Sequence, residues 1–219
     1  MDPARLMVIS RFFGARARAR SEERAQARAV VERLYGEAVR STRQSIFYQD
    51  WGVPDTLEGR YDVLVLHVHA LFRRLGALQR EQAAQTGHAE ADTDAAGLSQ
   101  ALFDHMVWDL DTNLREAGVS DMRIGARMKK LAKGFYGRVA IYDTALDAGD
   151  EQALRDALDR NVYHKVAAPP EGLTALAGYV QALVAASETW TWDALAHGSI
   201  HYPDPQGQRV NIPAKETVR

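Results

Sequence analysis

The sequence contains no cysteine among its 219 residues. Disulfides, thiolate nucleophiles, iron–sulfur clusters and cysteine-based zinc sites are therefore excluded, and the absence fits a reducing compartment. Long apolar runs are also missing. The best one, from Val63 to Phe72, contains two histidines and falls short of the roughly 18 apolar residues that span a membrane. The N-terminus lacks an apolar core followed by a small-residue cleavage site, which argues against a secretory signal.

Recognisable catalytic motifs are absent as well. The chain has no G-x-G-x-x-G, P-loop, G-x-S-x-G or H-E-x-x-H sequence and no internal repeat. Neither sign of charge is in large excess, because 27 basic and 29 acidic residues give a net charge of -2. Any anion-binding site must therefore come from a local patch, and the whole chain gives no reason to expect DNA as a partner. We predict no catalytic residue, no cofactor and no metal ion.

Apolar residues recur with helical periodicity, and strand-like alternation of useful length is absent. We therefore predict an all-α, single-domain bundle of about six helices over residues 21–197. Ser21, Asp55 and Asp150 are expected N-caps, and Gly118 is expected to end a helix. The predicted helices span residues 21–44, about six turns after residue 55, 98–117, 120–146, 151–163 and 172–195. Between them, the small and polar residues at about 82–97 predict a mobile insertion.

Two tails are expected to flank the bundle. Residues 1–20 form a basic tail with five arginines and no acid after residue 3, at positions Arg5, Arg11, Arg16, Arg18 and Arg20. Two interpretations of this tail stay open: a mobile, solvated segment, or one that contacts anionic lipid. Residues 198–219, with three prolines, predict an extended or disordered C-terminal tail.

The bundle is organised around residues 98–146, two amphipathic helices joined at Gly118. The first is acidic and aromatic, and the second is basic and contains two glycines in its basic stripe. Three interpretations of the stripe stay open: it faces solvent, it pairs with Asp104 and Asp111 across the hairpin, or it binds a phosphate, a lipid or an acidic peptide. The glycines predict a close approach by a helix backbone or a partner. The candidate contact residues of this helix are Arg123, Arg127, Lys130, Lys133, Gly134, Tyr136, Gly137 and Arg138.

An aromatic loop adds a second candidate surface. Phe47, Tyr48 and Trp51 lie together between two predicted helices, where aromatic rings either plug the end of a bundle or form a partner-binding patch. We include all three as candidate partner-binding residues. In the next helix, His67 and His69 point to opposite faces and cannot share a metal, so both are expected to be structural.

The acidic helix allows one enzymatic alternative. Aspartates cluster from Asp104 to Asp111, and clustered aspartates in helical proteins can hold magnesium for isoprenoid diphosphate chemistry. Only one helix offers such a cluster. His105 and Asp109 are four residues apart, but no second ligand pair accompanies them. A deep apolar pocket beside these aspartates would favour a ligand-binding or magnesium-dependent isoprenoid or quinone protein, and a filled core would argue against it.

Several separated motifs resemble the ubiquinol–cytochrome c chaperone family, in order over residues 29–163. They are Leu34-Tyr35-Gly36, Phe47-Tyr48, Asp50-Trp51-Gly52-Val53-Pro54-Asp55-Thr56, Gly59-Arg60-Tyr61-Asp62, Leu102-Phe103-Asp104, Asp109-Leu110-Asp111, Leu114-Arg115-Glu116-Ala117-Gly118-Val119, Lys129-Lys130 and Phe135-Tyr136-Gly137-Arg138. The resemblance implies a non-catalytic chaperone that binds newly made cytochrome b during assembly of the cytochrome bc1 complex. It also implies an inner-membrane association, a small partner chaperone and the ribosome. Without a convincing transit peptide, the chain resembles a bacterial-type member.

We therefore expect an assembly chaperone that lies peripherally on the cytoplasmic face of the inner membrane and holds cytochrome b or its loops. The basic stripe and the aromatic loop are its predicted contact surfaces. Two other classes stay open beside it. One is the isoprenoid or quinone protein described above, and the other is an RNA- or ribosome-binding module that uses the stripe from Arg123 to Arg138.

Overall fold

The computed structural model describes residues 25–208, except residues 88, 117 and 165. The all-α prediction is confirmed, since the described chain is helical and contains no strand. After a first helix at residues 25–42, the main helices are α2 (Ile46–Gln49), α3 (Leu57–Thr86), α4 (Asp94–Glu116), α5 (Asp121–Asp147), α6 (Glu151–Leu158), α7 (Pro170–Glu188) and α8 (Trp192–Ala196). A π-helical turn, Asp159–Tyr163, continues α6.

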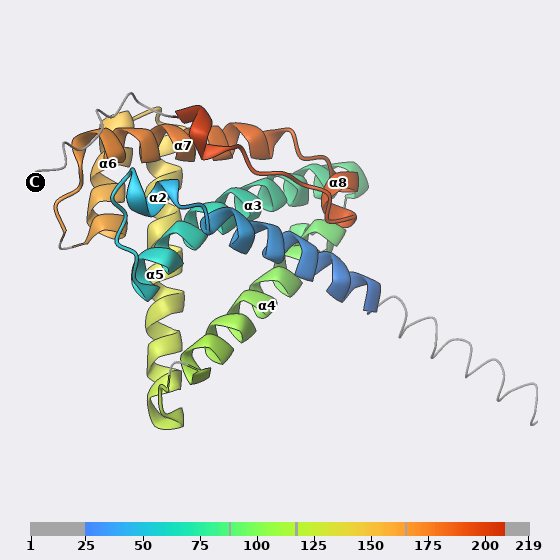
Figure 1. Cartoon of the computed structure of the whole chain (residues 1–219). Helices are drawn as coiled ribbons and strands as arrows, with labels where there is room; N and C mark the ends of the chain where they lie inside the picture. The colour runs from blue at the N-terminus through green and yellow to red at the C-terminus, as the bar shows by residue number, and fades with distance from the viewer. Residues whose placement is uncertain (1–24, 88, 117, 165, 209–219) are drawn as a thin grey trace, which may run out of the picture.

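Helix α3 is the centre of the molecule, with the other helices around it (Figure 1). Every residue from Asp62 to Leu71 is buried, so this part of the helix is enclosed on all sides. One apolar core contains Val63 and Leu66 of α3 together with α2, α6 and α7. The other lies against the first helix and α4. Helical periodicity describes one apolar face, whereas α3 contributes residues to two cores.

Local chemistry sets several helix ends. The Thr56 hydroxyl accepts a hydrogen bond from the Gly59 amide at 3.1 Å, so Thr56 caps α3 and the predicted cap at Asp55 is wrong. Asp55 instead pairs with Arg60 at 2.6 Å. Gly118 ends the α4 region with a φ of +79°, as predicted. Asp150 caps α6 as predicted, because its carboxylate accepts from the Ala153 amide at 2.9 Å.

Two predicted boundaries are wrong. The insertion at 82–97 is mostly helical, because α3 continues to Thr86 and α4 begins at Asp94. The predicted helix over 172–195 is two helices, broken between Glu188 and Trp192. The break has a local cause: the Thr191 hydroxyl accepts from the Ala194 amide at 3.2 Å and starts α8.

The predicted tails are only partly described. Ser21 and the basic segment 1–20 lie outside the described residues, as do residues 209–219. Residues 198–208 are not a free tail: Ile200 is buried, and the Tyr202 ring packs against Trp190 with 5.3 Å between centroids. The second core therefore extends beyond the expected limit at residue 197. Among the described helices, none has both the length and the apolar character needed to cross a membrane.

The aromatic loop contains a turn of helix, α2, and the rings of Phe47 and Trp51 fill the first core. Phe47 and Trp51 are fully buried, and their rings pack edge to face at 5.1 Å. Both contact the Tyr179 ring of α7, at 5.2 and 5.8 Å. The alternative of an exposed partner-binding patch is therefore wrong for Phe47 and Trp51, which close the end of the bundle. Tyr48 is half-buried and donates to the Thr42 carbonyl at 2.7 Å.

The two histidines of α3 have separate structural partners, as predicted. His67 is fully buried, with Nδ1 2.8 Å from the Val63 carbonyl and Nε2 2.9 Å from the Tyr179 hydroxyl. Burial lowers the pKa of His67 to about 4, so the ring is neutral in the core. His69 instead contacts Asp143 of α5 at 2.8 Å.

Candidate functional site

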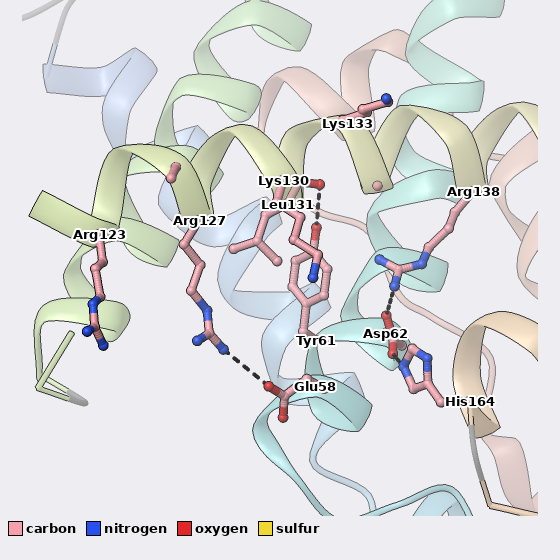
Figure 2. Close-up of a pocket in the computed structure, with 12 residues that line it drawn as sticks. Glu58, Tyr61, Asp62, Arg123, Arg127, Lys130, Leu131, Lys133, Arg138 and His164 are labelled. Carbon is pink, nitrogen blue, oxygen red and sulfur yellow. Dashed lines mark hydrogen bonds and ion pairs between the residues drawn. The ribbon is translucent and has the colours of Figure 1, made fainter. Parts of the chain in front are cut away.

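A basic groove runs between α5 and the N-terminal turns of α3 (Figure 2). Its volume is about 1030 Å³. Leu131, Tyr61 and Ala126 give it an apolar floor, and six cationic or imidazole side chains border it. Its lining is Glu58, Tyr61, Asp62, Arg123, Ala126, Arg127, Lys130, Leu131, Lys133, Gly134, Arg138 and His164. Six of the eight candidate residues of the basic helix therefore line one cavity.

The stripe pairs with α3, not with the acidic helix. Arg127 lies 3.2 Å from Glu58, and Arg138 lies 3.0 Å from Asp62. The alternative of a pairing with Asp104 and Asp111 is wrong, because these accept from Gln100 at 2.8 Å and Arg115 at 2.6 Å on their own helix. The residues that line the groove on α3 were not predicted, since contacts across about 70 residues leave no local periodic signal.

Three cations of the groove are left without a carboxylate partner in the described part of the chain. Arg123, Lys130 and Lys133 take part in none of its ion pairs. In Figure 2 Arg123 extends alone beside Arg127, and Lys133 projects from the opposite edge of α5. The groove thus holds an excess of positive charge over an apolar floor, which favours an anionic or acidic partner.

A buried carboxylate lies at one end of the groove. Asp62 is 1% exposed and faces Arg138 at 3.0 Å and His164 at 2.6 Å. Burial raises the pKa of Asp62 to about 6, although Arg138 and the hydrogen bond from His164 act in the opposite direction. His164 has a backbone φ of +54°, a conformation that residues other than glycine rarely adopt. The sequence alone did not predict Asp62 and His164 as site residues. For Asp62, the available signal was an acid directly before the apolar run that begins at Val63.

Two predicted contact residues of α5 lie outside the groove. Tyr136 is 58% exposed, and its ring packs on Phe103 of α4 at 5.8 Å. Gly137 is exposed on the same helix. A Cβ at Gly137 would meet no described atom within 4 Å, and one at Gly134 would meet only the end of the Arg138 side chain at 3.6 Å. The predicted close approach of another helix is therefore wrong, and a partner at these glycines stays a prediction.

The open space around Gly137 predicts that alanine at this position stabilises the protein. Gly137→Ala is expected to raise the free energy of unfolding by about 0.5–1 kcal/mol, because alanine favours helix interiors and the added methyl meets nothing. Urea denaturation of the purified variant measures the change. A loss of stability would contradict the observed open space around this residue.

The acidic helix is used for packing. Asp109 accepts from the Tyr35 hydroxyl at 2.8 Å, and the His105 ring packs edge to face on Tyr35 at 5.1 Å. A hollow of about 570 Å³ beside Asp104 and Trp108 lies against the first helix. Among the described residues, no three histidine, aspartate or glutamate side chains gather as a metal site would require. The hollow beside Asp104 is the place that the magnesium alternative would use, and charged residues such as Arg28 and Glu32 line it together with apolar ones.

Comparison with known proteins gives one consistent result. The family model described as ubiquinol-cytochrome C chaperone matches residues 49–202, more than half of the chain. A solved structure described as the Cbp3 homolog from Brucella abortus is similar at 35% identity with a TM-score of 0.71. The similarity covers 87% of this chain and 97% of that chain. No curated protein matches.

Proposed function

The chain belongs to the ubiquinol–cytochrome c chaperone family, and from this premise we propose that it binds newly made cytochrome b. The family and the similar Brucella abortus structure support an assembly role for the cytochrome bc1 complex and suggest a protein without a catalytic step. Cytochrome b as the bound subunit is the finer part of the proposal. The observation that carries it is the basic groove, where three cations have no carboxylate partner in the described chain.

The groove supports binding of a polar segment, such as a loop or a terminus of the membrane subunit. Arg123, Lys130 and Lys133 offer charge to an acidic segment, while Tyr61 and Leu131 offer it apolar contact area. An interface of this kind recognises its partner by charge complementarity and holds it by burying a few side chains. The proposal includes peripheral contact with the cytoplasmic face of the inner membrane, where such a subunit is inserted, and work beside a small partner chaperone and the ribosome.

Reversal of the unpaired cations tests the groove. We expect the triple variant Arg123→Glu/Lys130→Glu/Lys133→Glu to reduce the amount of cytochrome b that co-purifies with the tagged protein by about tenfold or more, because like charges then meet in the groove. None of the three replaced side chains holds a described ion pair, so the fold is expected to stay intact. Circular dichroism of the purified variant checks this.

A matched control separates position from net charge. Arg43→Glu/Arg80→Glu/Lys129→Glu makes the same charge change at exposed positions that do not line the groove. This control is expected to co-purify cytochrome b at the wild-type level. Equal losses in both triple variants would contradict the groove as the contact surface. A signal that disappears on ribonuclease treatment would favour the RNA-binding alternative.

A further inference from the structure

A small apolar pocket opens directly beside the basic groove. It has about 60 Å³ of free space, and its walls are Leu57, Tyr61, Leu110, Leu114 and Leu131, with Glu58, Asn113 and Arg127 at the rim. Four of these residues, Glu58, Tyr61, Arg127 and Leu131, also line the groove. The two cavities are therefore parts of one continuous surface where α3, α4 and α5 meet.

The pocket has the size of a single side chain. A cavity needs roughly 10–15 Å³ of such space to hold one water, so this one takes a few waters or one aliphatic side chain. Leu57, at the start of α3, is 52% exposed, which leaves a large apolar surface at the mouth of the pocket. Filling the pocket would cover this surface as well.

Along α5, the cation Arg123 lies before the pocket residues Arg127 and Leu131, and the cation Lys130 lies between them. Arg123 precedes Arg127 by one helical turn, and Lys130 follows it by nearly one turn. From Arg123 to Arg138 the helix rises by about 22 Å, a length that roughly seven residues of extended chain would cover. A bound segment of that length would place its central residue near Arg127 and Leu131, at the pocket.

We propose that this two-part surface binds an extended polypeptide segment of about seven residues, in which one large apolar side chain enters the pocket and acidic residues on either side of it contact Arg123 and Lys130. The inference rests on the proposed chaperone function and specifies the chemistry of the bound segment. Glu58 opposes an acidic segment, because it is itself a carboxylate and pairs with Arg127 at 3.2 Å. Acidic side chains of the partner compete with it for this guanidinium.

Other partners fit this surface less well. A lipid acyl chain is far longer than the pocket. A nucleic acid strand would bring phosphates toward Glu58 and Asp62, and its bases would need free aromatic faces on which to stack. Arg138 already lies over the Tyr61 ring at 5.7 Å, and the His164 ring, which also lines the groove, contacts Asp62 at 2.6 Å.

Peptide binding to the purified full chain tests the proposal. The probe is a fluorescein-labelled peptide of sequence Ser-Asp-Glu-Leu-Glu-Asp-Ser, followed by fluorescence anisotropy at low salt. Replacing its leucine with alanine is expected to weaken binding about tenfold, the lower end of what burial of one leucine contributes. On the variant Leu57→Gln, the same replacement is expected to weaken binding less than about threefold, since the pocket has lost an apolar wall. Ile141→Gln, at an exposed position outside both cavities, is the matched control and keeps the tenfold effect.

A charge variant gives an effect of the opposite sign. Glu58→Gln is expected to tighten binding of the acidic peptide about threefold, because it frees Arg127 and removes a like charge. An amide analogue of the peptide, with asparagine and glutamine in place of its acids, should lose both its affinity and its response to Glu58→Gln. The proposal is overturned if the acidic peptide binds no better than this analogue. It is also overturned if the leucine effect is unchanged on Leu57→Gln, or if anionic phosphatidylglycerol vesicles bind while the peptide does not.

The peptide experiment tests the two-part site, and the co-purification experiment tests the proposed chaperone function, so either proposal can be contradicted without the other. If the peptide binds as expected but cytochrome b does not co-purify with the wild-type protein, the surface chemistry stands and the assignment of cytochrome b is wrong. If cytochrome b co-purifies and depends on the groove cations while the leucine and carboxylate effects are absent, the chaperone function stands and the two-part site is wrong.

Discussion

Arg138→Ala is expected to lower the free energy of unfolding by about 3 kcal/mol at pH 8. The Arg138 guanidinium lies 3.0 Å from the carboxylate of Asp62, which is 1% exposed. Removing one partner of a buried ion pair leaves the other charge without compensation, and such changes typically destabilise by about 3–5 kcal/mol. We place the effect at the lower limit because His164 keeps its contact to the other carboxylate oxygen at 2.6 Å.

The loss of unfolding free energy caused by Arg138→Ala is expected to depend on pH. Burial raises the pKa of Asp62 to about 6, while an aspartate in the unfolded chain titrates near 3.9. The folded state therefore binds this proton more tightly, so the contribution of Asp62 to stability falls as pH rises from about 4 to about 6. Arg138 opposes the rise of the Asp62 pKa, so its removal raises that pKa further. The destabilisation by Arg138→Ala should accordingly be smaller at pH 5, where the carboxyl carries a proton, than at pH 8.

Urea denaturation at pH 5 and pH 8 measures both effects. The double variant Asp62→Asn/Arg138→Ala is expected to recover most of the loss at pH 8 and to show little of its pH dependence, because no buried charge remains at residue 62. Arg127→Ala is the matched control on the same helix. Its pair with Glu58 is exposed on both sides, so we expect a change below about 1 kcal/mol. Equal losses in Arg127→Ala and Arg138→Ala would show that burial does not distinguish the two pairs.

The helices could be predicted from the sequence because their signals are local. Periodicity predicted α5, and Gly118 and Asp150 marked two of the ends that the structure confirms. Periodicity also predicted the helix that begins after residue 55, but it did not predict that the α3 residues from Asp62 to Leu71 are all buried. A periodic pattern describes one apolar face, whereas the enclosure of α3 depends on how many other helices surround it.

Only the α5 side of the candidate site could be predicted from the sequence. The basic stripe on α5 is visible in the sequence because its residues are three and four apart on one helix face. The acidic partners that the sequence suggested, Asp104 and Asp111, lie on the wrong helix. The actual partners, Glu58 and Asp62, are about 70 residues away along the chain, and nothing local links them to Arg127 or Arg138. A stripe of one charge predicts that opposite charge is nearby, and only the tertiary structure identifies its source.

The aromatic residues show a related limit. Phe47 and Trp51 pack on Tyr179, and this contact forms only when α7 returns across the first core. From the sequence alone, the same rings more often plug a bundle, but they are also compatible with an exposed patch. The close approach of α7 decides between the plug and the exposed patch. Its one local sign in the sequence is Gly172, in the first turn of α7.

Gly172→Ala is expected to destabilise the protein by about 3 kcal/mol. A Cβ at this position would lie 2.2 Å from the carbonyl oxygen of Trp51 and 2.9 Å from its Cα, both of which are backbone atoms. Backbone cannot rotate away as a flexible side chain can, so α7 or the Trp51 segment must shift. The same carbonyl accepts a hydrogen bond from the buried Tyr163 hydroxyl at 2.9 Å, and a shift of Trp51 would lengthen it.

Thermal and urea unfolding of Gly172→Ala is compared with that of Gly36→Ala. The comparison separates the effect of the close contact between α7 and the Trp51 backbone from the effect of helix propensity. Gly36 lies within the first helix, and a Cβ there would meet no described atom within 4 Å. Both variants gain the same propensity, so Gly36→Ala is expected to be stabilised by up to about 1 kcal/mol while Gly172→Ala loses stability. A stabilised Gly172→Ala would mean that α7 does not contact the Trp51 backbone. The burial of Phe47 and Trp51 in the first core would then be wrong as well, because α7 forms one side of that core.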